Sequence, residues 1–79
     1  MDAEVTVDAR GSRCPVPINE LSRALESASA TVIELLADDP NARVDVPVWC
    51  RLTRHDLVEV TEAGGAWRFV VRATEAPRP

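Results

Sequence analysis

One of the two cysteines in this 79-residue chain, Cys14, has neighbours that can make a thiol reactive. Cys14 directly precedes Pro15, and proline favours the first position of a helix, so we expect Cys14 at a helix N-cap. The free amides and the positive end of the helix dipole there stabilise a thiolate. Arg10 and Arg13 add positive charge, and Pro15 and Pro17 stiffen the segment that presents the sulfur. These features predict a nucleophilic Cys14 with a pKa lowered from about 8.5 into the range of about 3.5 to 7.5.

A structural role is the alternative for each cysteine, because free cysteines are commonly small buried hydrophobic residues. For Cys14 the helix start, the flanking arginines and the paired prolines favour the reactive interpretation. Gly11 allows the chain to turn sharply just before this segment. Cys50 follows Trp49 in an apolar stretch of a second predicted helix, so we expect Cys50 to be a packed core thiol.

The remaining polar residues are weaker candidates for a site. His55 is expected to cap the second helix or to enter the next strand, and Asp38 and Asp39 are expected to be capping residues rather than an acid–base pair. One histidine and two cysteines without a metal-binding spacing predict no metal site. All nine basic residues are arginine, which excludes a Schiff-base lysine or a P-loop lysine. The net charge of −4 argues against nucleic acid as a direct partner.

Four short segments with alternating or largely apolar residues predict the strands that must position Cys14. They are Glu4–Asp8, Thr31–Ala37, Leu57–Glu62 and Trp67–Arg72. Between the last two, residues 63–66 read Ala-Gly-Gly-Ala and predict a tight antiparallel hairpin. In the third strand, Val58 and Val60 are expected to form the apolar face.

Two helices are predicted between these strands. The first spans Pro15–Ala28, with an apolar stripe made of Ile18, Leu21, Leu25 and Ala28. Asp38-Asp39-Pro40 is a start signal for the second helix, but Pro47 would interrupt a helix interior. We therefore expect the regular second helix to begin near Asp45, with Asp45 as its cap, and to end by Thr53. The residues expected to pack both helices against the sheet are Leu21, Leu25, Trp49 and Leu52.

The order strand, helix, strand, helix, strand, strand predicts a single α/β domain over residues 1–79, with a core of about 4–72 and a frayed tail at 73–79. We expect a two-layer α/β sandwich in which a mixed four-stranded sheet, in β-α-β-α-β-β order, carries both helices on one face. No apolar run is long enough for a membrane span, and the first residues lack the pattern of a secretory leader. A cytoplasmic protein that does not bind membranes is therefore expected.

The segment around Cys14 resembles the TusA/SirA-like sulfur-carrier family, also called the sulfurtransferase TusA family. The family signature is Cys-Pro-x-Pro after an Asp-x-x-Gly segment, and the matching residues here are Asp8, Gly11, Cys14, Pro15 and Pro17. The Asp-Asp-Pro turn at 38–40, the Asp-hydrophobe-Pro segment at 45–47 and His55 also match. The resemblance extends from about Val5 to Arg72. The chain differs from the family at Ser29-Ala30, where a glycine or similar small break is usual, and at Arg54, where glycine is frequent before the histidine.

The resemblance implies the same sandwich fold and a sulfurtransferase-type function, in which Cys14 carries sulfur as a persulfide between proteins. The donor would be a cysteine desulfurase or a rhodanese-like protein, and no organic cofactor or metal would be needed. The motif residues Arg10, Gly11, Arg13, Pro15 and Pro17 would support Cys14, and we expect a monomer when the protein is free. Family members serve tRNA thiolation, molybdenum-cofactor metabolism or sulfur oxidation.

Two functions of other classes remain open at this point. The chain could be a regulatory module that binds partners and in which Cys14 is incidental. It could also be a thiol redox switch, for which Cys50 is the available resolving cysteine.

Overall fold

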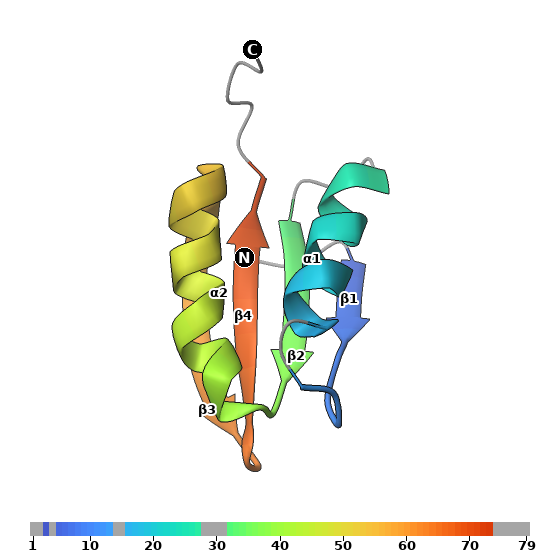
Figure 1. The fold of residues 1–79 in the computed structure, drawn as a ribbon, viewed down its shortest axis with the longest axis vertical. Helices are drawn as coiled ribbons and strands as arrows, with labels where there is room; N and C mark the ends of the chain where they lie inside the picture. The colour runs from blue at the N-terminus through green and yellow to red at the C-terminus, as the bar shows by residue number, and fades with distance from the viewer. Residues whose placement is uncertain (1–2, 4, 14–15, 28–31, 74–79) are drawn as a thin grey trace.

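The computed structural model describes residues 3, 5–13, 16–27 and 32–73 (Figure 1). Their helices and strands follow the predicted order. They are β1 (Val5–Asp8), α1 (Val16–Ser27), β2 (Val32–Ala37), α2 (Pro40–Thr53), β3 (Asp56–Ala63) and β4 (Ala66–Arg72).

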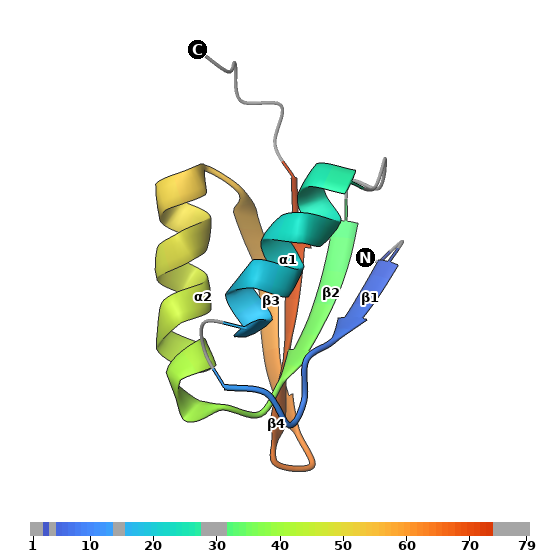
Figure 2. The ribbon, with the colours of Figure 1, turned by 45° about the vertical axis from the view of Figure 1, so that its right-hand side comes forward.

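The four strands form one mixed sheet in the order β1-β2-β4-β3. β1 pairs with β2 in parallel, whereas the β2–β4 and β3–β4 pairs are antiparallel. Both helices lie on the same side of this sheet, and no described helix covers the opposite side (Figures 1 and 2). The predicted two-layer α/β sandwich is therefore confirmed.

The hydrophobic core lies between the sheet and the two helices. β2 is central, because Ile33, Leu35 and Ala37 are all 0% exposed and β2 has a neighbouring strand on each side. From α1, Leu21 is fully buried, while the polar residues of the opposite side of the helix are exposed, as the predicted stripe requires. Ala28, the last residue of that stripe, lies outside the described residues. Among the described residues, the buried cluster consists of Ala9, Leu21, Ile33, Leu35, Ala37, Ala42, Val46, Cys50, Phe69 and Val71.

The predicted hairpin between β3 and β4 is confirmed. Ala63 pairs with Ala66, and the two residues between them, Gly64 and Gly65, have φ angles of +60° and +81°. Two consecutive residues with positive φ match the right-handed twist of the flanking strands, and glycine adopts this conformation without steric cost.

The predicted start of the second helix near Asp45 is wrong. α2 begins at Pro40, and the side chain of Asp39 caps it by accepting a 3.1 Å hydrogen bond from the Asn41 amide. Ala42, Val46 and Cys50 form one buried stripe along α2, and each is at most 2% exposed. A helix that began at Asp45 would not include Ala42 in this stripe. Pro47 lies inside the helix and removes one backbone hydrogen bond, at a cost of about 3 kcal/mol. Burial of this stripe and the capped start offset that cost.

Two predictions about apolar side chains were also wrong. Leu52 does not pack on the sheet but is 76% exposed, because it lies two residues, and therefore about 200° around the helix, from the buried Cys50. In β3, a bulge between Leu57 and Glu59 shifts the alternation, so that Leu57 packs against the core. Val58 and Val60 remain 42% and 39% exposed on this edge strand.

Candidate functional site

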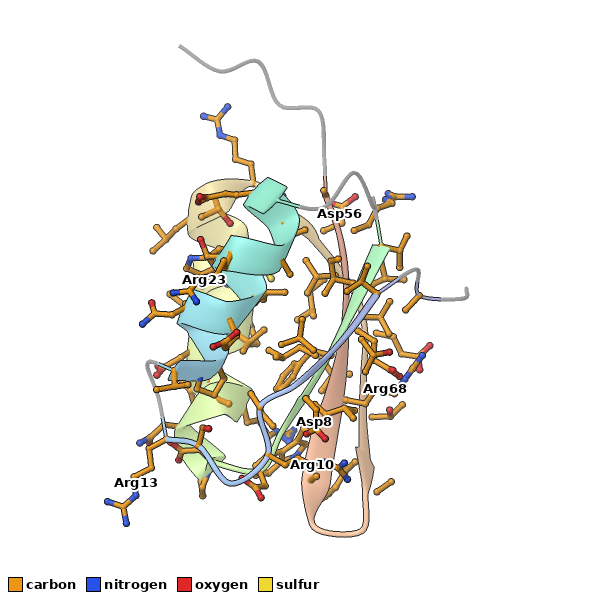
Figure 3. The ribbon with its side chains drawn as sticks, turned by 90° about the vertical axis from the view of Figure 1, so that its right-hand side faces the viewer. Asp8, Arg10, Arg13, Arg23, Asp56 and Arg68 are labelled. Carbon is orange, nitrogen blue, oxygen red and sulfur yellow. The ribbon has the colours of Figure 1, made fainter. Side chains whose placement is uncertain are left out.

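The loop that follows β1 begins with an ion pair between Asp8 and Arg10. The Arg10 guanidinium donates two hydrogen bonds to the Asp8 carboxylate, from Nη2 at 2.7 Å and from Nε at 2.8 Å, and the Arg10 backbone amide donates a third at 3.1 Å. These bonds lower the pKa of Asp8 from 3.8 to about 2. Asp8 and Arg10 lie side by side at the end of β1 (Figure 3). The positive charge of Arg10 is therefore engaged by a carboxylate two residues away.

Gly11 joins this loop to a second one. Its φ is +84°, and its amide donates a 2.9 Å hydrogen bond to Oδ1 of Asp38 in the connection between β2 and α2. A side chain at position 11 would find open space, so glycine is required there by the backbone conformation rather than by crowding. The Asp-x-x-Gly segment and the Asp-Asp-Pro turn, 27 residues apart in the sequence, therefore meet at one end of the sheet.

Asp38 was expected to be a capping residue, and the structure assigns it a different contact. The adjacent Asp39 caps α2, while Asp38 binds across to Gly11. The sequence carried a signal for this contact, because one helix N-terminus needs one capping side chain and two acids precede Pro40. The sequence could not show that the Gly11 amide is the group that Asp38 binds.

Backbone hydrogen bonds hold the same loop against the sheet. The Ala9 amide donates to the Leu36 carbonyl at 2.8 Å, which extends the β1–β2 pairing by one residue beyond Asp8. Ala9 is only 3% exposed, and the Ser12 amide donates back to its carbonyl at 3.2 Å. The chain is thus fixed by several independent contacts up to Ser12.

Cys14 and Pro15 lie outside the described residues, so the prediction that Cys14 caps α1 is not tested by the structure. The residues on either side are described. α1 begins at Val16, whose amide donates to the Arg13 carbonyl at 2.9 Å, and Pro17 is fully buried. Arg13 is exposed and points away from the protein (Figure 3), and no ion pair joins it to any described residue.

Cys50 is a packed core thiol, as predicted. It is 2% exposed within the buried stripe of α2. Burial disfavours the thiolate and raises the pKa of Cys50 from 9.0 to about 11. At neutral pH this thiol is therefore both inaccessible and protonated.

His55 lies between the end of α2 and the start of β3, which agrees with its expected role in capping and strand entry. Its backbone amide donates to the Cys50 carbonyl at 2.9 Å, and its imidazole ring lies 5.6 Å from the indole ring of Trp49. The residue before it, Arg54, closes the helix in the left-handed conformation with a φ of +63°. Arg54 is one of the positions at which the sequence differs from the family that it resembles.

The described residues contain no group of three histidine, cysteine, aspartate or glutamate side chains that could hold a metal ion. Over the same residues, neither helix combines the length and the apolar composition needed to cross a membrane.

Comparisons with known proteins agree with this arrangement. Residues 5–73 match the family model for "Sulfurtransferase TusA". The chain is 41% identical to a "Putative sulfur carrier protein" of Archaeoglobus fulgidus over 69 residues. This alignment covers 86% of the present chain and 94% of that protein. The present chain is 33% identical over 70 residues to "Sulfur carrier protein TusA" of Pseudomonas entomophila, with 87% and 88% of the two chains covered.

A solved structure shares the fold. The crystal structure of the SirA-like protein from Desulfitobacterium hafniense superposes with a TM-score of 0.77 at 23% sequence identity, over 90% of this chain and 99% of that one. The match over residues 5–73 includes the whole sheet, both helices and the loop that leads to Cys14. The chain therefore belongs to the sulfurtransferase TusA family.

Proposed function

We propose that the protein is a sulfur carrier that holds sulfur as a persulfide on Cys14, receives it from a donor protein and passes it to an acceptor protein. The observation that carries this proposal, beyond membership of the family, is the burial of Cys50. Of the two cysteines, Cys50 is enclosed in the core with a pKa of about 11, so Cys14 is the thiol left to do the chemistry.

The transfer is an exchange between a thiolate and a persulfide. The Cys14 thiolate attacks the terminal sulfur of the donor persulfide, the bond between the donor's two sulfurs breaks, and the donor leaves as a thiolate. The transferred sulfur keeps its proton, so Cys14 becomes Cys14-S-SH. An acceptor thiolate then attacks the same terminal sulfur and restores the Cys14 thiolate. Neither step needs an external oxidant, a metal or an organic cofactor.

The described residues around Cys14 support this role in different ways. Arg13 is exposed beside Cys14 in the sequence, where a cation favours the thiolate and can meet a partner protein. Arg10 is engaged by Asp8, so its contribution in this proposal is to shape the loop rather than to offer a free charge. The buried Pro17 fixes the start of α1.

The donor in this proposal is a cysteine desulfurase or a rhodanese-like protein, and the acceptor belongs to tRNA thiolation, molybdenum-cofactor metabolism or sulfur oxidation. The place of action is the cytoplasm, where free thiols are kept reduced. The carrier acts as a single domain that is monomeric between transfers.

The test is intact-mass analysis after incubation with a persulfide-loaded rhodanese domain. The Cys50→Ala variant is expected to gain the mass of one sulfur atom, and the Cys14→Ser variant is expected to gain none. A disulfide between Cys14 and Cys50, or a sulfenic acid on Cys14, would instead indicate a redox switch. If neither variant gained sulfur while partner binding survived in Cys14→Ser, the protein would be a regulatory binding module.

A further inference from the structure

We propose that Asp38 is a positioning residue for sulfur transfer, and that it acts through its hydrogen bond to the Gly11 amide. This inference rests on the proposed role of Cys14. Asp38 Oδ1 accepts from the Gly11 nitrogen at 2.9 Å, and Gly11 is three residues before Cys14. This bond joins a side chain of the β2–α2 connection to the described part of the loop that leads to the thiol.

The bond is placed where it can decide the direction of the loop. Before Gly11, the chain is held to the sheet by the bond from Ala9 to Leu36, and Asp8 holds Arg10. At Gly11 the backbone turns with a φ of +84°. Without a restraint, a glycine can adopt many other backbone conformations as readily as this one. The Ser12 amide closes this turn by donating to the Ala9 carbonyl, and the contact with Asp38 adds a second restraint that anchors the Gly11 amide to a different connection of the fold.

Asp38 is itself well anchored. It lies between Ala37, the fully buried last residue of β2, and Asp39, whose side chain caps α2. Its backbone is therefore set by a core strand on one side and a helix start on the other. A carboxylate whose backbone is held in this way can keep the Gly11 amide in a fixed position.

Asp38 can act on sulfur transfer through its hydrogen bond to the Gly11 amide or through its negative charge, and a pair of substitutions separates these two effects. Asp38→Asn and Asp38→Ala both remove the negative charge, but only Asp38→Asn keeps an oxygen that can accept from the Gly11 amide. The ratio of the two transfer rates therefore isolates the hydrogen bond from the charge. Asp45→Asn is the matched control, because it removes an exposed acid from α2 that has no ion pair among the described residues.

The experiment measures the rate of sulfur transfer from a persulfide-loaded rhodanese domain to Cys14, together with amide hydrogen exchange at Gly11. Asp38→Ala is expected to slow transfer by about threefold to tenfold and to lose protection of the Gly11 amide. Asp38→Asn and Asp45→Asn are expected to keep transfer and protection near those of the unmodified protein. Inorganic polysulfide, a small donor that needs no docking, is expected to load Cys14 of Asp38→Ala with a smaller rate loss.

Equal transfer rates for Asp38→Ala and Asp38→Asn would overturn the proposal, and so would unchanged exchange at Gly11 in Asp38→Ala. If Asp38→Ala did not fold, Asp38→Ser would replace it, because the serine oxygen lies one bond closer to the backbone and cannot reach as far. Failure of the carrier function itself would look different. The unmodified protein would then take up no sulfur on Cys14, while the exchange at Gly11 would still report the bond to Asp38.

Discussion

The guanidinium group of Arg68 on β4 binds the carboxylate of Glu34 on β2, on the side of the sheet that carries no described helix (Figure 3). The cross-strand neighbours of Val70 are Glu34 on β2 and Glu59 on β3, and Arg68 binds both carboxylates. Thr6 on β1 donates to Glu34 at 2.8 Å, so this polar row crosses all four strands. Val70 is consequently only 1% exposed, although it does not belong to the core beneath the helices.

Removal of this cover should destabilise the protein. We expect Arg68→Ala to lower the free energy of unfolding by about 1–2 kcal/mol, because it removes two charge-assisted hydrogen bonds and the apolar stem that shields Val70. Urea denaturation at pH 7 measures the change. Arg72→Ala, which removes an exposed pair with Asp56, is the control and should cost less than about 1 kcal/mol. Equal losses in the two variants would contradict a special role for Arg68.

The same network predicts a dependence on pH. Hydrogen bonds from Arg68 and Thr6 lower the pKa of Glu34 below its ordinary value of 4.5. Because the folded pKa is the lower one, the stabilisation is complete above about pH 4.5 and is lost as the pH falls through the folded value. The difference in unfolding free energy between the unmodified protein and Arg68→Ala should therefore shrink between pH 7 and pH 3. A constant difference would show that Glu34 does not respond to Arg68.

The ion pair between Asp8 and Arg10 predicts a titration that can be followed directly. The Asp8 carboxyl should titrate near pH 2 in the folded protein, and in Arg10→Ala its midpoint should move toward 3.8, because Arg10 provides the bonds that favour the charged form. Carbon-detected NMR of the carboxyl group measures both midpoints. The pair should hold the loop fully above pH 3.8 and release it as the pH falls through about 2. An unchanged midpoint in Arg10→Ala would refute this assignment.

The end of α2 offers a stabilising substitution. Arg54 has a φ of +63°, where a side chain is strained and glycine is not. We expect Arg54→Gly to raise the free energy of unfolding by about 0.5–1 kcal/mol, after the greater entropy of glycine in the unfolded chain is taken into account. Arg51→Gly, one turn earlier and within the helix, should instead lower it by about 1 kcal/mol. Thermal unfolding of both variants tests the contrast, and a loss of stability in Arg54→Gly would contradict it.

The two cysteines should differ strongly in reactivity. Cys50, with its pKa of about 11 and 2% exposure, should be alkylated at neutral pH only as fast as the protein opens. Cys14, whose reaction is measured in the Cys50→Ala variant, should be alkylated much faster than Cys50. In that background, Arg13→Ala should raise the pKa of Cys14 by less than about one unit, because one exposed charge contributes little. Alkylation rates between pH 5 and 10, within the range in which thiols titrate, test this; faster reaction at Cys50 would remove the physical basis of a carrier on Cys14.

Local patterns in the sequence were sufficient for most of the architecture. The alternation of Trp67, Phe69 and Val71, the glycine pair at 64–65 and the apolar spacing in α1 each act within a few residues. The buried face of β4, the hairpin and the buried side of α1 could therefore be predicted. The resemblance around Cys14 likewise depends on neighbouring residues, and it identified the family that the comparisons then showed.

Only the tertiary structure decided the features that depend on partners distant in the sequence. The start of α2 depended on whether burial of Ala42 outweighs the cost of Pro47, and that balance is set by the sheet beneath the helix. The contact of Asp38 with Gly11 joins residues 27 positions apart. The cover that Arg68 provides for Val70 depends on the pairing of three strands. A sequence specifies which side chains can bind or be buried, but the pairing of strands and connections determines which of them meet.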